Sequence, residues 1–178
     1  MAKSKFIAIK SNELVIDLFD ENDINDEYVS WLNDPEVVKF SNQRFKQHSI
    51  DSCLNYAKTF ENTQNLFVKI STINDLKMVG TMTVYINEYH KTADIGIMVG
   101  DKSQWGKGVG KQAWQMMIDW LKSLKTYRKI TAGTMNCNIG MLKVMESCGM
   151  TLEATKVKQE LLDGKEIDLK YYGLFTEE

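Results

Sequence analysis

The sequence predicts an α+β fold in which helices pack on a mixed, mostly antiparallel sheet within a single domain spanning residues 1–178. Short apolar runs rich in β-branched residues alternate with stretches of helical periodicity, which is the pattern of such a sandwich. A chain of 178 residues with 43% hydrophobic residues can form a core without disulfides or metal. It contains no repeat and no linker-like stretch, so no domain boundary is predicted.

The first half of the chain predicts one strand, two helices and three strands. A helix that begins at Asp26 must end near Leu32, because the residue before Pro35 disfavours helical geometry. Ser49 is a typical N-cap for a second helix that runs to about Phe60. Alternating or continuous apolar residues predict strands over Glu13–Phe19, Leu66–Thr72, Met78–Ile86 and Thr92–Val99.

The second half begins with a glycine cluster and then predicts a helix, a strand, a helix and a hairpin. Apolar residues at helical spacing indicate a helix from about Val109 to Leu124. A second helix should end at Gly149. The expected elements are the helix Val109–Leu124, the strand Lys129–Met135, the helix Ile139–Ser147, and hairpin strands Thr151–Leu162 and Glu166–Phe175 around Asp163–Gly164.

Composition excludes several functional classes. Lys and Arg total 22 against 24 Asp and Glu, which gives no support to nucleic-acid binding. Three cysteines without a CxxC pair and two histidines predict neither a disulfide framework nor a metal site. The N-terminal residues lack the long apolar run of a signal peptide or membrane span. We therefore expect a cytoplasmic protein with no membrane partner.

The most informative segment is the glycine-rich run Gln104–Gly110, between an apolar strand and an amphipathic helix. Alternating glycines allow a sharp turn and close approach of the backbone to a ligand. Amide groups of such a loop and a helix N-terminus together form an anion site. A tight turn without a ligand is the alternative. The dinucleotide-binding and P-loop patterns fit this segment less well.

Three segments together resemble the GNAT superfamily of acetyltransferases. Tyr89–Val99 is similar to the family's fourth strand, Trp105–Gly110 to its pyrophosphate loop, and Asn138–Met150 to the helix that ends in its Gly-Phe pair. Their order and spacing agree with the family over nearly the whole chain. The resemblance implies an N-acetyltransferase that uses acetyl-coenzyme A (acetyl-CoA) as co-substrate.

The resemblance also implies a cofactor site. The backbone of Ile97, Met98 and Val99 would pair with the pantetheine arm, and Asn138 would lie near the thioester. Two positions depart from the family: Trp105 replaces a frequent Arg or Gln, and Met145 replaces a tyrosine that protonates the leaving thiolate, which a thioether cannot do. The amides of Gly106, Lys107, Gly108, Val109 and Gly110 would hold the pyrophosphate.

The reaction needs a base, because an alkyl ammonium with a pKa near 10.4 must lose a proton before it attacks. Asp94 is the first candidate for the base and His90 the second. The two residues are four positions apart, so their side chains would lie on the same face of a regular strand. A solvated strand position is the alternative for Asp94, and a loop contact is the alternative for His90.

The acceptor is predicted to be a small-molecule amine. Trp31-Leu32-Asn33-Asp34-Pro35 resembles acetyltransferases of nucleotide-linked amino sugars. Trp31, Arg44 and Tyr85 are assigned to the substrate site; the alternatives are a helix-core anchor for Trp31, which is favoured, a surface charge for Arg44 and core packing for Tyr85. The Tyr-His-x-x-Ala-acid pattern also resembles spermidine acetyltransferases, and ribosomal-protein N-terminal acetyltransferases are a third option. A non-catalytic acyl-CoA sensor and a plain interaction domain stay open. The apolar C-terminal hairpin is compatible with a homodimer.

Overall fold

The computed structural model describes residues 3 and 6–176, and its centre is one sheet of eight strands. The strands lie in the order β1-β2-β3-β4-β5-β6-β8-β7. Neighbours are antiparallel except β5 and β6, which are parallel. The strands are β1 (Ile9–Lys10), β2 (Leu14–Leu18), β3 (Leu66–Thr72), β4 (Met78–Asn87), β5 (Thr92–Val99), β6 (Lys129–Met135), β7 (Thr151–Leu162) and β8 (Lys165–Phe175).

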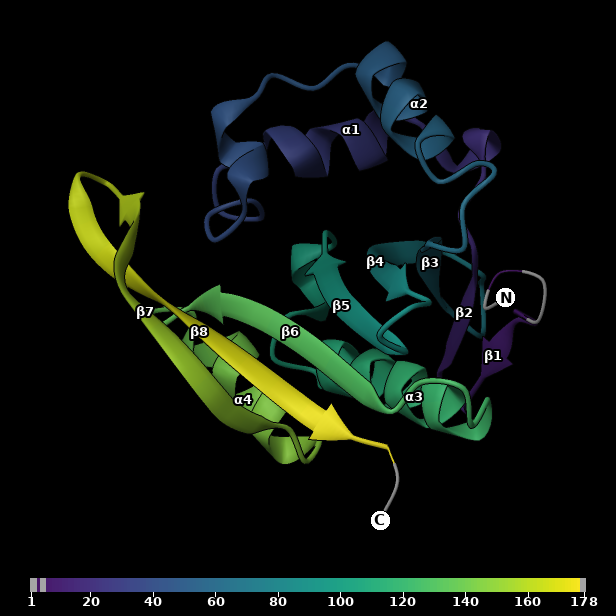
Figure 1. Ribbon diagram of the computed structural model, residues 1–178. Helices are drawn as coiled ribbons and strands as arrows, with labels where there is room; N and C mark the ends of the chain where they lie inside the picture. Colours follow the sequence, from purple (N-terminus) through teal and green to yellow (C-terminus); the bar gives the residue numbers. More distant parts are fainter. Residues whose placement is uncertain (1–2, 4–5, 177–178) are drawn as a thin grey trace.

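Four α-helices cover the sheet within the described part of the chain. The first pair, α1 (Asp26–Asn33) and α2 (Ile50–Lys58), lies on one side, and α3 (Val109–Ser123) and α4 (Ile139–Ser147) lie on the other (Figure 1). Three-residue and four-residue 3-10 turns include η3 (Asn42–Phe45), between α1 and α2, and η4 (Lys102–Gln104), before α3. None of the described helices has the length and apolarity needed to cross a bilayer.

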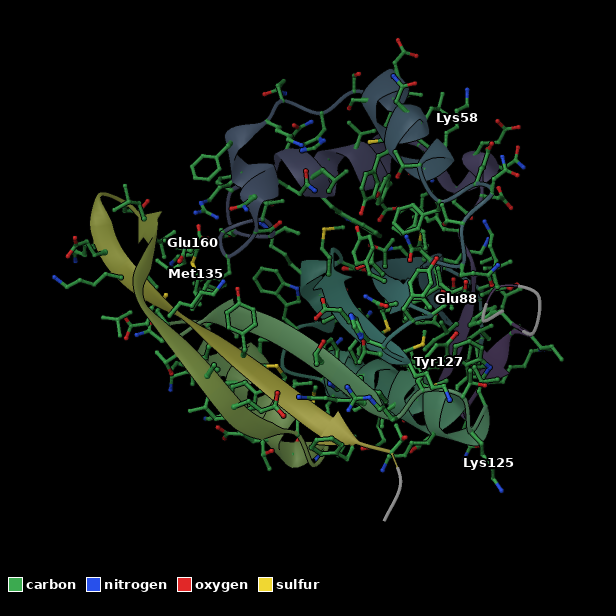
Figure 2. All side chains as sticks on the ribbon, in the orientation of Figure 1. Lys58, Glu88, Lys125, Tyr127, Met135 and Glu160 are labelled. Carbon is green, nitrogen blue, oxygen red and sulfur yellow. The ribbon has the colours of Figure 1, made fainter. Side chains whose placement is uncertain are left out.

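Two apolar clusters hold these layers together. The larger cluster packs α3 and α4 against the sheet, with Trp114, Met117 and Leu121 almost fully buried on one face of α3. The smaller cluster joins α1 and α2 to the opposite face through aromatic side chains, including Tyr28 and Phe67. Side chains extend into the space between α1–α2 and the sheet (Figure 2). Each helix is thus fixed by its own apolar stripe.

The parallel pair at the centre of the sheet is short. Pairing between β5 and β6 covers Thr92–Asp94 and Lys129–Thr131 and then stops. Beyond this point β6 stays paired with β8 as far as Met135, while β5 stays paired with β4 as far as Val99. The two strands diverge (Figure 1), and Met135 lies at the end of β6 beside the β7–β8 hairpin (Figure 2). The sheet therefore opens into a gap at its centre.

The structure confirms every predicted helix and long strand, with boundary shifts of one or two residues. The sequence prediction missed β1, a two-residue strand at the edge of the sheet. It also did not anticipate how exposed β7 is: nearly all of its side chains are exposed, including Leu152, Val157 and Leu161. A positive φ at Lys158 accompanies a bulge between Lys156 and Glu160.

Candidate active site

The edge of β5 that faces the gap carries peptide groups that pair with no neighbouring strand beyond Asp94. Gly100 donates its N–H to the carbonyl oxygen of Val79 at 3.0 Å, so this peptide group faces β4. Successive residues of a strand direct their peptide groups to opposite sides. Val99 and Ile97 therefore direct theirs toward the gap, whereas the peptide group of Met98 faces β4. An extended ligand arm can add to this edge as a strand would.

The glycine loop closes the gap at the end of β5. The indole Nε1 of Trp105 donates to the carbonyl oxygen of Val99 at 2.8 Å, which fixes the ring beside the strand end. Gly106 and Gly108 adopt φ of 75° and 86°, a region that side chains disfavour, and a Cβ at either would meet nothing within 4 Å. Lys107 between them is exposed.

The N-terminus of α3 opens onto the same space. Its N-cap is Gly108, which supplies no side-chain hydrogen bond to the first turn. The first amides, from Val109 and Gly110, therefore remain available for a ligand. Open amides, the positive end of the helix and Lys107 together give this end of the gap the character of an anion site.

An ion-pair network attaches the loop to the α1 side of the molecule. The ammonium of Lys102 lies 2.7 Å from Asp34 and 2.8 Å from Glu36. Hydrogen bonds to these two carboxylates raise the pKa of Lys102, and Asp34 has the larger effect. Lys102 in turn lowers the pKa of Asp34. A second pair joins Lys77 to Asp101 at 3.0 Å. The loop is therefore held between β5 and the segment that follows α1.

The gap continues into a cleft of about 790 Å³ that reaches from the glycine loop to the space under α1 and α2. One wall is β5 with Trp105 and Gly110. The opposite wall comes from β6 and α4, and the third wall is aromatic. The walls include Gly133, Thr134, Asn138, Met141 and Val144 from β6 and α4, and Tyr28, Phe40, Tyr56 and Phe67 from the aromatic side.

Asn138 lies on the cleft wall as the N-cap of α4. Its Oδ1 accepts the N–H of Met141 at 3.3 Å, and its Nδ2 donates to the hydroxyl of Thr134 at 3.0 Å. Met145, which replaces the family's tyrosine, is fully buried in the core rather than on the cleft surface. Met141 and Val144 are the α4 side chains that face the cleft beside Asn138.

Asp94 lies where β5 and β6 separate. Its carboxylate accepts a hydrogen bond from the hydroxyl of Thr131 at 2.6 Å, across the last backbone pair of the two strands. Surrounding protein displaces water from the carboxylate and raises the pKa of Asp94, while the Thr131 hydrogen bond acts in the opposite direction. A carboxylate held in this way is suited to proton transfer.

Tyr85 and His90 precede Asp94 in the chain and lie in different elements: Tyr85 is on β4 and His90 is in the turn between β4 and β5. Tyr85 is directly opposite Asp94 on β4, and its hydroxyl is 3.0 Å from that of Tyr56 on α2. His90 lies in the turn before β5, where Lys91 has a φ of 53°. The strand is thus not regular through His90. Tyr56 lines the cleft, whereas Asp94, His90 and Tyr85 lie outside its lining, with Asp94 adjacent to the lining residue Ile95.

Trp31 and Arg44, which were assigned to the substrate site, contact other parts of the protein instead. Trp31 is buried and packs so tightly on Gly100 that a Cβ there would lie 2.1 Å from the ring. Arg44 donates to the carbonyl oxygens of Ser41 and Leu161, which links η3 to the hairpin. Neither residue lines the cleft. The sequence reasoning missed Lys39 and Phe40, which do.

Comparison with known proteins agrees with this arrangement. Residues 13–151 match the model of the acetyltransferase (GNAT) domain family. The probable N-acetyltransferase YjcK of Bacillus subtilis is 30% identical over 112 residues, which is 61% of this chain and 61% of that protein. The uncharacterized protein MJ1062 of Methanocaldococcus jannaschii is 24% identical over 141 residues, 79% of this chain. The matched regions span 28% and 61% of the length of these two curated relatives.

Solved structures share the fold. The ribosomal L7/L12 alpha-N-protein acetyltransferase RimL, in complex with coenzyme A, superposes with a TM-score of 0.83 at 18% identity, over 95% of this chain and 98% of that one. The spermidine N-acetyltransferase of Vibrio cholerae, in complex with coenzyme A and spermine, superposes with a TM-score of 0.82 at 17% identity. The superposition covers 93% of this chain and 97% of that one. The open edge of β5, the glycine loop and the family match lead to one conclusion: the chain belongs to the GNAT acetyltransferase family.

Proposed function

We propose that this protein transfers the acetyl group of acetyl-CoA to the primary amine of a small molecule. The observation that carries the proposal is the gap between β5 and β6, which opens beside the uncapped N-terminus of α3. The amides of residues 106–110 and the helix end would hold the pyrophosphate. The peptide groups of Ile97 and Val99 would pair with the pantetheine arm, and acetyl-CoA supplies the activated acyl group.

Asp94 is the proposed base. Its position at the inner end of the gap suits removal of a proton from an amine that approaches from the α1–α2 side, directly or through a water molecule. The Thr131 hydroxyl holds the carboxylate in place. His90 is retained only as a secondary candidate, because it lies in the turn before β5, whereas Asp94 lies on β5 at the last pair with β6.

For the acceptor we propose the amino group of a nucleotide-linked sugar. The space under α1 and α2 has aromatic walls, including Tyr28, Tyr56 and Phe40, that suit stacking on rings. Lys39 lines the cleft and has no carboxylate within ion-pair distance in the described chain, so it suits a phosphate. Glu36 is the one carboxylate among the described cleft-lining residues, and Lys102 neutralises it. This charge pattern favours an anionic acceptor over a polyamine.

The experiment is a two-stage assay on the purified protein. Calorimetry with acetyl-CoA first measures binding. Thiol release is then measured with three acceptor classes: UDP-linked amino sugars, spermidine, and peptides with a free N-terminus. We expect turnover with the sugar nucleotides. Turnover with spermidine or peptide alone would reassign the acceptor, and binding without any thiol release across the panel would identify an acyl-CoA sensor.

We also propose that the protein forms a homodimer through the edge of β7. This strand borders the sheet and exposes Leu152, Val157 and Leu161. An exposed apolar edge strand is a surface for pairing with another chain. Light scattering coupled to size-exclusion chromatography tests the state directly: a monomeric mass at high concentration would refute the dimer.

A further inference from the structure

Thr134 places a buried hydroxyl on the wall of the cleft. It is the penultimate residue of β6, it lines the cleft, and its relative exposure is 7%. Because side chains alternate along a strand, Thr134 faces the same side as Ala132, which packs in the α3–α4 core. The hydroxyl therefore approaches the gap from the side of α4, opposite to the α1–α2 side on which Asp94 and Thr131 lie.

The hydrogen bonds around Asn138 determine how the Thr134 hydroxyl is used. Since Oδ1 of Asn138 accepts from the N–H of Met141, the amide Nδ2 is the atom that faces Thr134. An amide nitrogen only donates, so the Thr134 oxygen is the acceptor in that 3.0 Å contact. The hydroxyl proton is then left to point elsewhere. Residues 3 and 6–176 provide it no acceptor within hydrogen-bond distance.

The side chains of α4 beyond its N-cap supply no comparable donor to this wall. Met145, at the position of the family's tyrosine, is buried in the core. Met141 and Val144 line the cleft but carry no hydrogen-bond donor in their side chains. The polar side-chain hydrogens on this wall of the gap are therefore the Thr134 hydroxyl of β6 and the second N–H of Asn138 at the N-cap of α4.

We propose that the Thr134 hydroxyl, oriented by Asn138, donates a hydrogen bond to the sulfur of bound coenzyme A and stabilises it as the leaving group. This inference rests on the proposed function, because it requires coenzyme A in the gap between β5 and β6. Thr134 acts as the catalytic residue, and Asn138 is a positioning residue that acts through it.

The chemistry balances without a general acid. When the amine attacks, the carbon–sulfur bond breaks and its electron pair stays on sulfur. The ammonium loses one proton to Asp94 before it attacks and a second proton to water as the amide forms. Asp94 then releases its proton to solvent, and the thiolate takes up one proton from water. Thr134 keeps its own proton throughout. A thiol with a pKa near 8.5 is already a fair leaving group, so hydrogen bonding is sufficient assistance.

The pKa of the coenzyme A thiol in the complex tests this inference without an acceptor. It is measured by the ultraviolet difference absorbance of the thiolate during a pH titration, at coenzyme A concentrations that calorimetry shows to be saturating. Thr134→Val removes the hydroxyl and keeps the shape. We expect it to raise the bound thiol pKa by roughly one to two units, the effect of losing one hydrogen bond to an anion.

Thr134→Ser is the matched control, because it restores the hydroxyl; it should return the thiol pKa to the wild-type value. Thr134→Ala replaces Thr134→Val if the valine variant does not fold. An unchanged thiol pKa in the valine or alanine variant, with coenzyme A still bound, would overturn this inference alone. Absence of coenzyme A binding by the wild-type protein would instead overturn the proposed function.

Discussion

Asp94 and Thr131 form the last backbone pair between β5 and β6, and their side chains join across it by a 2.6 Å hydrogen bond. Beyond this pair the strands separate into the gap in which we propose that acetyl-CoA binds. One contact thus marks the inner end of the proposed cofactor site and fixes the proposed base. A change at either residue should alter proton transfer more than folding.

Replacement of Asp94 by Asn should lower kcat by roughly 10²-fold or more, because the amide cannot take the amine's proton. The affinity for acetyl-CoA, measured by calorimetry, should stay within about twofold of wild type, because Asp94 contacts none of the anion-binding groups. Thr131 can still donate to the amide oxygen. Unchanged turnover in the folded variant would remove Asp94 from the mechanism.

The same variant makes a prediction about stability and pH. The raised pKa of Asp94 means that the folded chain binds this proton more tightly than the unfolded chain does. The carboxyl group therefore contributes stability that is present at low pH and is lost as the pH rises through the raised pKa. An asparagine side chain at this position cannot ionise, so Asp94→Asn should unfold at the same temperature or higher at pH 7. A lower melting temperature would indicate a structural carboxylate.

Thr131→Val should move the acid limb of the kcat/KM profile to higher pH. The Thr131 hydroxyl stabilises the ionised carboxylate and holds the pKa of Asp94 down against the effect of burial. Without it, Asp94 takes up its proton at a higher pH and the base is lost earlier. Thr131→Ser is the control that keeps the hydroxyl. Coincident profiles for valine and wild type would exclude this coupling.

Gly108→Ala and Gly164→Ala form a matched pair. Both glycines have positive φ, 86° and 76°, and a Cβ at either meets nothing within 4 Å. Each alanine should cost about 1–2 kcal/mol of stability. Only Gly108 borders the proposed pyrophosphate site, so only its alanine should also weaken acetyl-CoA binding, by roughly tenfold or more. Equal acetyl-CoA affinities in the two variants would contradict the assignment.

Gly100→Ala should destabilise the protein by about 3 kcal/mol, because its Cβ would lie 2.1 Å from the ring of Trp31. Gly110→Ala is the control. Gly110 lies in α3, and its Cβ would lie 3.6 Å from the side chain of Val99 on β5, which is an ordinary van der Waals contact. Thermal unfolding of both variants measures the difference. A Gly100→Ala protein as stable as Gly110→Ala would show that Trp31 does not anchor α1 on the strand end.

Lys39→Met should raise KM for a UDP-linked amino sugar about tenfold and leave the acetyl-CoA dissociation constant unchanged, because one charged hydrogen bond to the acceptor is lost. Lys46→Met removes a charge of the same kind outside the cleft and serves as the control. Equal KM values for the two variants would exclude Lys39 from the acceptor site.

The fold was predictable because its signals are local. Pro35 marks the end of α1, Ser49 caps α2, and the apolar spacing in α3 defines its buried face. The short β1 was missed because two residues carry no periodicity. The glycine loop was recognisable because the backbone at positions 106 and 108 needs a positive φ, which glycine adopts more easily than other residues do. The glycines in the sequence therefore indicate the sharp turn.

The acceptor side was less predictable because it depends on tertiary contacts. Trp31 was assigned to the substrate, but its packing on Gly100 joins residues far apart in sequence. Arg44 was assigned to the acceptor and Lys39 was not, although both are ordinary cations in the sequence. Only the fold shows that Arg44 reaches the hairpin while Lys39 reaches the cleft. Thr134 likewise carries no motif of its own, and its role follows from the orientation of Asn138.

Residue-resolved hydrogen exchange with and without coenzyme A tests the central claim most directly. If the β5 edge and the glycine loop hold the ligand, the amides of Ile97, Val99, Gly106 and residues 108–110 should become protected when coenzyme A is added, whereas the amide of Lys107 already donates to the carbonyl oxygen of Gln104. The amide of Met98 should change little, because its peptide group already faces β4. Unchanged exchange at Ile97, Val99 and the loop, with coenzyme A present at saturation, would contradict the account.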